Sequence, residues 1–351
     1  MRYTRARRSS QIEMLVDPTR RAAEYGNTVP SVSVIVPAYC AAKRIGKAID
    51  SILAQAFTDY EIIVINDGSP DTNELESTLS GFSAPIIYLK QQNLGPGAAR
   101  NAGIREARGE FLAFLDADDY WKSNFLAEQI GFLEHNREIE LVYADALIVG
   151  SSPLAGRTFM EATPSTGDVT LESLLSARCT IILSGVLARR RSVIAAGMFD
   201  ETFRHSEDYD LWLRMAKSGS RIAYQRNLLL VRSEHGGGLT ANTTQLFESA
   251  LRVLDKAQRQ YDLTESECAA LISHRKRLEA YIRLDRGKHD LLLGEFASAA
   301  AAFREANEFY RSWKLRLVLL SLRVAPRLLL RIQGVMRPAE SRSKRASQVY
   351  E

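Results

Sequence analysis

Hydrophobic and polar positions follow two alternating patterns from residue 31 onward. Continuous apolar runs, rich in β-branched residues, lie at 32–37, 60–65, 85–89 and 111–115 and are typical of strands buried on both faces. The segments between them place apolar residues at helical spacing, as in 42–54. Four alternations of strand and helix with short connections predict a largely parallel α/β sheet with helices on both faces.

Polar loops follow the predicted strands at 38–39, 66–71 and 116–119. In open α/β sheets ligands bind at the carboxyl ends of the strands. We therefore expect these three loops to converge at one edge of the sheet and to form a binding site there.

The pattern divides the chain into three parts. Residues 1–30 are polar and basic and are predicted to form a flexible leader, 31–241 an α/β domain, and 242–351 a helical C-terminal region. Residues 287–306 resemble one helix pair of the tetratricopeptide type. Since an array needs about three such units, we favour a structural helical hairpin.

Charge is concentrated near the C-terminus. Residues 311–346 contain ten Lys or Arg residues and one acid, Glu340, in a chain whose net charge is +4. Residues 313–336 interleave leucines and valines with arginines, as interfacial helices do. We predict peripheral membrane contact through 313–345 and no binding of nucleic acid. The alternative is a basic tail packed on its own helical domain.

Composition excludes several other classes. The chain is 46% hydrophobic and 25% charged, as soluble globular proteins are, and no run approaches the roughly 20 apolar residues of a membrane span. No apolar run follows the basic N-terminus, so a secretory signal peptide is not expected. The three cysteines, Cys40, Cys179 and Cys268, are far apart, which fits a reducing, cytoplasmic location.

An acidic cluster, Asp116, Asp118 and Asp119, follows the fourth predicted strand. Carboxylates this close repel one another, and a divalent cation that bridges them to a diphosphate would offset the repulsion. The alternative is a turn in which Asp119 caps the next helix.

Two further segments carry candidate chemistry. Glu207 and Asp208 stand in the first turn of a predicted helix, where a carboxylate can act as a general base or can simply cap the helix. His235 precedes three glycines and is either a metal or phosphate ligand or a structural residue. The glycine-rich segment 95–97 opens a helix but matches neither a dinucleotide-binding fingerprint nor a P-loop.

The order of these motifs resembles the family 2 glycosyltransferases, which have the GT-A fold, a Rossmann-like and mostly parallel sheet. The resemblance covers about 31–239 and rests on five segments: 33–39, 64–69, 93–103, 114–119 and 207–208. It implies inverting transfer of a sugar from a nucleoside-diphosphate sugar to an acceptor hydroxyl, with Mn²⁺ or Mg²⁺ as cofactor.

The resemblance also implies roles for individual residues. Asp208 would be the catalytic base, with Glu207 beside it. Asp118 would be the direct metal ligand. His235 stays a second candidate ligand because of its position before three glycines, independently of the resemblance. The nucleotide-sugar site would contain Pro37, Ala38, Tyr39, Asp67, Asn93, Arg100 and Asp116.

Two absences bear on the subtype. The Q-x-x-R-W motif and the membrane spans of processive synthases of this family are both absent, which favours transfer of a single sugar, to a glycan or lipid-linked acceptor in cell-surface polysaccharide assembly.

Two alternatives remain. A sugar nucleotidyltransferase usually carries a glycine-rich loop after its first strand, and 38–42 contains no glycine. A non-catalytic scaffold would act through the C-terminal helices.

Overall fold

The computed structural model describes residues 13–14, 29–235 and 243–326. The chain divides into two compact units, 1–271 and 272–351, and the boundary falls within helix α11. Of the predicted leader, Glu13–Met14 forms strand β1, and the rest of 1–28 lies outside the described residues. Residues 327–345 of the predicted membrane-contacting tail also lie outside them.

The predicted alternation of strands and helices is confirmed in the first half of the chain. The elements there are β2 (Val32–Ala38), α2 (Ile45–Leu53), β3 (Tyr60–Asp67), α3 (Thr72–Ser80), β4 (Ile87–Gln91), α4 (Pro96–Glu106) and β5 (Phe111–Phe114).

The next part of the chain mixes shorter elements. They are β6 (Tyr120–Trp121), α5 (Phe125–His135), β7 (Ile139–Gly150), α6 (Phe159–Ala162), α7 (Leu171–Leu175), the 3₁₀ helix η1 (Leu183–Gly185), β8 (Val186–Arg189), α8 (Arg190–Ala195), α9 (Glu207–Lys217) and β9 (Arg221–Glu234). Helices follow at α10 (Thr243–Gln260), α11 (Glu265–Leu293), α12 (Phe296–Tyr310) and α13 (Trp313–Val324).

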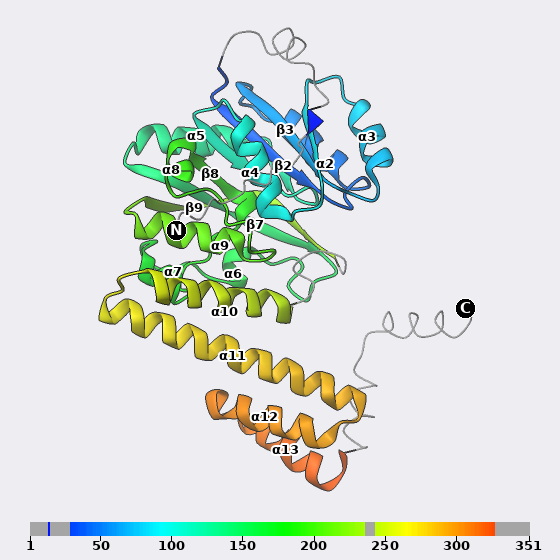
Figure 1. Cartoon of the computed structure of the whole chain (residues 1–351), viewed down its shortest axis with the longest axis vertical. Coiled ribbons are helices and arrows are strands. Elements are labelled where there is room, and N and C mark those ends of the chain that lie inside the picture. Colours follow the sequence, from blue (N-terminus) through cyan, green and yellow to red (C-terminus); the bar gives the residue numbers. More distant parts are fainter. Residues whose placement is uncertain (1–12, 15–28, 236–242, 327–351) are drawn as a thin grey trace, which may run out of the picture. The chain divides into compact units, whose positions relative to one another are not determined.

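The strands of the described residues form one sheet in the order β1-β4-β3-β2-β5-β8-β7-β9-β6, of which Figure 1 labels β2, β3, β7, β8 and β9. Strands β4, β3, β2 and β5 run parallel, as predicted. Beyond β5 the sheet is mixed, because β8 is antiparallel to both of its neighbours and β9 is parallel to β7. The predicted α/β fold is therefore confirmed, with its parallel region confined to β2–β5 and the β7–β9 pair.

Helices cover both faces of the parallel region. Alternate residues of β2, such as Val34 and Val36, share a core with Ile49 of α2 and Leu126 of α5. On the other face, α4 approaches the strands closely at Gly103, where a Cβ atom would lie 2.7 Å from Ile35 Cγ2. This close approach aligns α4 along the sheet, so that residues one turn earlier reach the carboxyl ends of the strands.

The loops at these strand ends converge, as predicted. The Cys40 amide donates to Ser69 Oγ at 2.7 Å, and the Ala42 amide donates to Asp71 Oδ2 at 3.0 Å. These bonds tie the loop after β2 to the loop after β3. Gly68 has a φ of 65°, and a Cβ there would lie 2.6 Å from the Asn93 nitrogen, so the β3 loop also packs directly on the loop before α4.

In the second unit, α12, α13 and the C-terminal part of α11 pack around a small core. Gly294, with a φ of 83°, ends α11 and lets the chain reverse into α12. Leu291, Phe303 and Leu322 are buried in this core. The predicted helical hairpin is confirmed, and in the described residues no helix is long and apolar enough to cross a membrane.

Candidate active site

A buried arginine joins the two acidic motifs. Arg100, on α4, is 4% exposed. One of its terminal nitrogens donates to Asp116 Oδ1 at 2.7 Å and the other to Glu207 Oε1 at 2.5 Å. The structure thereby brings together three residues that the sequence predicted for one site, of which Arg100 and Glu207 are 107 residues apart.

Local sequence explains why Arg100 lies there. Pro96 begins α4, and Gly97 packs against α9, where a Cβ would be in ordinary contact with Glu207 Cγ at 3.5 Å. Asn101 exchanges two hydrogen bonds with the backbone of Phe199, at 2.8 and 2.9 Å. Together these contacts fix α4 against the segment that leads into α9.

Asp119 has a role that the sequence did not predict. The alternative that it caps the next helix is wrong, because α5 begins at Phe125 and is preceded by Asn124. Asp119 is buried and instead accepts from Ser184 Oγ at 2.7 Å and from the Ser233 amide at 2.9 Å. Burial, with Asp116 and Asp118 nearby, raises its pKa. Asp119 thus fastens the acidic loop to η1 and to the end of β9.

This attachment brings His235 to Asp118. His235 follows β9, and its Nε2 lies 2.8 Å from Asp118 Oδ2. Burial and the Asp116 charge raise the pKa of Asp118, and His235 opposes that shift. The other ring nitrogen of His235 has no hydrogen-bond partner in the described part of the chain.

The donor atoms here fit a hard divalent cation. The side chains of Asp116 and Asp118 keep 39% and 30% of their surface exposed, so both carboxylates reach solvent. No group of three or more His, Cys, Asp or Glu side chains among the described residues is arranged to hold a metal alone. One or two carboxylates with a diphosphate completing the shell is the usual arrangement for Mg²⁺, and these residues match it.

Asp208 lies beside the Arg100–Glu207 pair in the first turn of α9, as predicted. Among the described residues its carboxylate accepts one hydrogen bond, from the Tyr209 amide at 2.8 Å. Burial and the negative charges of Glu207 and Asp116 raise its pKa, Arg100 and the Tyr209 amide lower it, and the net result is a pKa of about 7. Its remaining lone pairs are available to a ligand.

The predicted nucleotide side of the site is less uniform. Tyr39 exposes 52% of its surface after β2, whereas Ala38 is buried and Pro37 is partly buried. Asp67 accepts three hydrogen bonds from the chain, from Gln91 Nε2 and from the amides of Leu94 and Gly95.

Asp67 therefore fixes the conformation of the loop before α4, whether or not it also contacts a ligand. Asn93, in that loop, is exposed and accepts from Arg204 at 3.3 Å.

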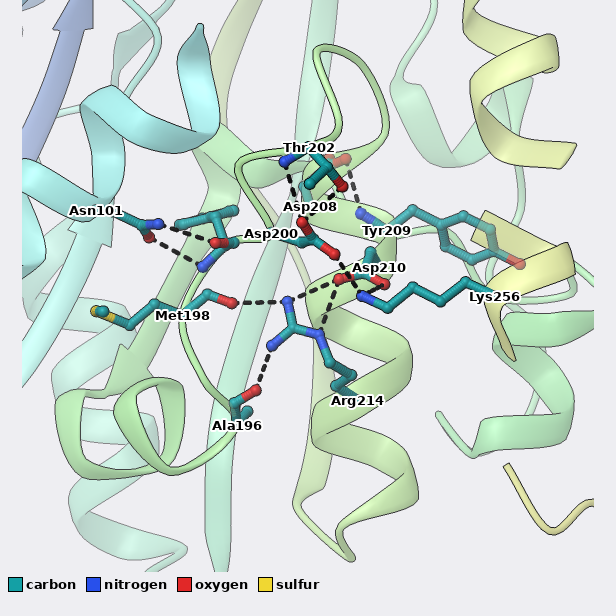
Figure 2. Close-up of polar contacts among 11 residues, drawn as sticks. Asn101, Ala196, Met198, Asp200, Thr202, Asp208, Tyr209, Asp210, Arg214 and Lys256 are labelled. Carbon is teal, nitrogen blue, oxygen red and sulfur yellow. Dashed lines mark hydrogen bonds and ion pairs between the residues drawn. The ribbon is translucent and has the colours of Figure 1, made fainter. Parts of the chain in front are cut away.

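A network of charges that are buried or partly buried fixes helix α9 to neighbouring segments (Figure 2). Asp210 is 1% exposed and accepts from Arg214 at 2.8 Å and from Lys256 at 2.7 Å. Lys256 also contacts Asp200 at 2.8 Å, and Arg214 donates to the carbonyl oxygens of Ala196 and Met198. Helix α10, which the sequence analysis assigned to the C-terminal region, thus stabilises the helix that carries Asp208.

Sequence reasoning missed this network because its members have little individual signal. In the sequence, Asp210 is one of several acidic residues in a predicted helix. Lys256 lies 46 residues later in an amphipathic helix, and nothing near it in the sequence indicates that the two pair. One indication was present: Asp210 lies three residues after Glu207, next to the apolar positions Leu211 and Trp212, on the buried side of α9.

Comparison with known proteins decides the family. The glycosyl transferase family 2 model matches residues 33–151. The chain is 28% identical to the uncharacterized glycosyltransferase RP339 of Rickettsia prowazekii, over 83% of this chain and 85% of that one. It is 30% identical to the Escherichia coli UDP-Glc:alpha-D-GlcNAc-diphosphoundecaprenol beta-1,3-glucosyltransferase WfgD, over 54% of this chain and 71% of that one. The chain is a family 2 glycosyltransferase.

The fold of this glycosyltransferase agrees with solved GT-A structures. The mannosyltransferase PcManGT of Pyrobaculum calidifontis, in complex with GDP-Man and Mn²⁺, superposes with a TM-score of 0.59 at 19% identity, over 88% of this chain and 85% of that one. Family membership decides against the two alternatives that the sequence left open, a sugar nucleotidyltransferase and a non-catalytic scaffold.

The charge network behind α9 yields a stability prediction. In Lys256→Met, Asp210 and Asp200 lose a shared cation that is only 16% exposed, and we expect the free energy of unfolding to fall by about 2 kcal/mol. We also expect kcat to fall more than the donor KM rises, because α9 carries Asp208. Urea unfolding and initial-rate kinetics measure the two effects.

Lys217→Met is the control, since Lys217 is exposed at the C-terminal end of α9 and donates to the Asp262 carbonyl oxygen, outside the charge network. We expect this variant to stay within about 0.5 kcal/mol of wild type. Equal unfolding curves for Lys256→Met and Lys217→Met would show that the network does not stabilise α9.

Proposed function

We propose that this glycosyltransferase transfers a single sugar from a nucleoside-diphosphate sugar to an acceptor hydroxyl with inversion at the anomeric carbon. Asp208 is the general base. Asp116 and Asp118 form the metal-diphosphate site. The observation that carries the proposal is Arg100, which holds the acidic loop after β5 and the first turn of α9 in one place.

The state of Asp208 supports its role as base. A base for a hydroxyl group needs a carboxylate with free lone pairs and a pKa near the working pH. Asp208 has both features, since it accepts a single backbone hydrogen bond and its pKa is raised. It accepts the hydroxyl proton while the acceptor oxygen bonds to the anomeric carbon. The bond from that carbon to the diphosphate breaks, and the diphosphate leaves with the electron pair.

The donor lies along the carboxyl ends of β2, β3 and β5 in this proposal. The exposed Tyr39 ring, with Pro37 and Ala38, packs on the nucleotide base, and Asp67 contacts that base through its remaining lone pair. Asn93 and Arg100 lie on the nucleotide side. The chain's similarity to a glucosyltransferase named for UDP-Glc and to a structure that contains GDP-Man supports a nucleoside-diphosphate sugar, and leaves the base open.

A divalent cation, Mn²⁺ or Mg²⁺, would be held by Asp118 and His235, and would neutralise the leaving diphosphate. Asp116 stays paired with Arg100 through Oδ1, and its other oxygen would remain for the metal-diphosphate site. Asp119 keeps the loop in position through Ser184 and Ser233 and does not need to contact a ligand.

The acceptor is proposed from the relatives. WfgD is named for a diphosphoundecaprenol-linked sugar, and AmsB of Erwinia amylovora for amylovoran biosynthesis, which supports a glycan or lipid-linked acceptor in cell-surface polysaccharide assembly. Contact of residues 313–345 with the cytoplasmic face of a membrane would bring a lipid-linked acceptor to the enzyme.

The first test replaces the base. Asp208→Asn removes the proton acceptor and keeps the shape of the side chain, so we expect the transfer rate to fall about 10²- to 10⁴-fold while the Kd for the donor stays within about twofold. Radiolabelled sugar transfer and isothermal titration measure these quantities. Asp168→Asn, at an exposed position, is the control. Transfer at the wild-type rate by Asp208→Asn would remove Asp208 from the mechanism.

The second test follows the pH dependence. A raised pKa keeps the Asp208 carboxyl protonated in acid, and only its ionised form accepts a proton. At saturating metal, kcat/KM should therefore rise with pH through about 7 and then level off. A value of kcat/KM that stays constant from acid pH to well above neutrality would contradict this assignment.

The third test concerns the metal. We expect UDP-glucose or GDP-mannose to raise the melting temperature in the presence of Mn²⁺ and to do so far less in EDTA, because a ligand that binds only the folded state stabilises it. Asp118→Asn should raise the Mn²⁺ concentration needed for half the shift by at least about tenfold. An unchanged Mn²⁺ requirement in this variant would exclude Asp118 as a ligand.

A further inference from the structure

Helix α13 has two apolar faces, and its own unit uses only one of them. Leu315, Val318, Leu319 and Leu322 pack on the core formed with α11 and α12. With 3.6 residues per turn, these four positions share one side of the helix. An ordinary surface helix would carry polar residues on the opposite side.

The opposite side of α13 is apolar and exposed instead. Trp313, Leu317, Leu320 and Val324 are 65%, 52%, 56% and 76% exposed. Their spacing of four, three and four residues places them within about 60° of one another around the helix. We call these four residues the outer face of α13. Large apolar side chains gathered in this way indicate an interaction surface.

Cations border the outer face on both sides. Lys314 lies along one border and Arg316 and Arg323 along the other, and all three are exposed. None of them forms an ion pair with another described residue, and α13 contains no acid. The outer face is therefore an apolar strip between two positive borders, with an aromatic ring at its N-terminal end.

We propose that the outer face of α13 docks on an anionic phospholipid surface. Apolar side chains on one strip enter the headgroup region, flanking cations meet the lipid phosphates, and tryptophan prefers that interface. The proposal refines the membrane contact of the proposed function and rests on that part of it. It limits the contact to four apolar and three basic residues, because the other face of the helix is already buried.

The charges argue against two other occupants. A second copy of the chain, packed face to face, would place positive borders against positive borders. The tail of this chain, 327–351, contains six Arg or Lys residues and two acids, so it has the same sign as the borders. An anionic surface is the occupant that complements both the apolar strip and its borders.

Vesicle flotation of the full-length protein, without any donor, tests this proposal. The vesicles are phosphatidylcholine alone and phosphatidylcholine mixed with phosphatidylglycerol. Wild type should float with the mixed vesicles and bind the neutral ones at least tenfold more weakly. Leu317→Ser/Leu320→Ser should weaken binding to the mixed vesicles by at least tenfold. In Lys314→Gln/Arg316→Gln/Arg323→Gln, the affinity for the mixed vesicles should fall about fivefold for each charge removed.

Ile194→Ser is the matched control, since Ile194 is 42% exposed in the other unit, and it should float as wild type does. Circular dichroism confirms that each variant is folded. Failure of wild type to bind either vesicle, or equal binding by wild type and Leu317→Ser/Leu320→Ser, overturns the proposal.

The proposal is also overturned if the wild type is a dimer, Leu317→Ser/Leu320→Ser is a monomer and neither binds vesicles. That result would assign the outer face to contact with a second copy of the chain. The flotation assay contains no donor, so a negative result would not bear on the transferase assignment. Sugar transfer to a water-soluble acceptor tests that assignment separately.

Discussion

The arrangement of the site depends on one buried cation. Arg100 lies out of solvent between Asp116 and Glu207, and a lone charge in that position would be costly. Burial lowers its pKa, and the two carboxylates raise the pKa by more, so the side chain stays charged. The acidic loop after β5 and the first turn of α9 therefore cannot separate without leaving a buried charge unpaired. In the proposed mechanism, this constraint joins the donor side of the site to Asp208, the proposed base.

The surrounding fold holds each partner of Arg100 in place. Gly103 lets α4 lie close to the sheet, and Asn101 bonds α4 to the Phe199 backbone, so that the position of the Arg100 backbone is fixed. Asp119 fastens the acidic loop to β9. Lys256 fastens α9 through Asp210. The site is thus positioned by contacts made behind it, while Asp208 and Asp118 keep lone pairs for ligands.

The sequence was sufficient for the parallel strands, their loops and the residues at their ends. These features follow from local periodicity, since a polar residue directly after a buried parallel strand lies at the carboxyl edge of the sheet. It was insufficient for Asp119 and for Lys256, whose partners lie 65 and 46 residues away, because no local pattern records which distant segment a buried charge meets. It also could not divide the apolar residues of α13 into an inner and an outer face, since that division requires knowing which side α12 covers.

A double-mutant cycle between Arg100 and Glu207 tests the central claim most directly. The free energies of unfolding of Arg100→Met, Glu207→Met and the double variant are measured beside wild type in urea. If the buried pair joins α4 to α9, each single variant loses several kcal/mol and the coupling energy is about 1–3 kcal/mol. A coupling energy below about 0.5 kcal/mol would show that the two residues act independently and would contradict the account.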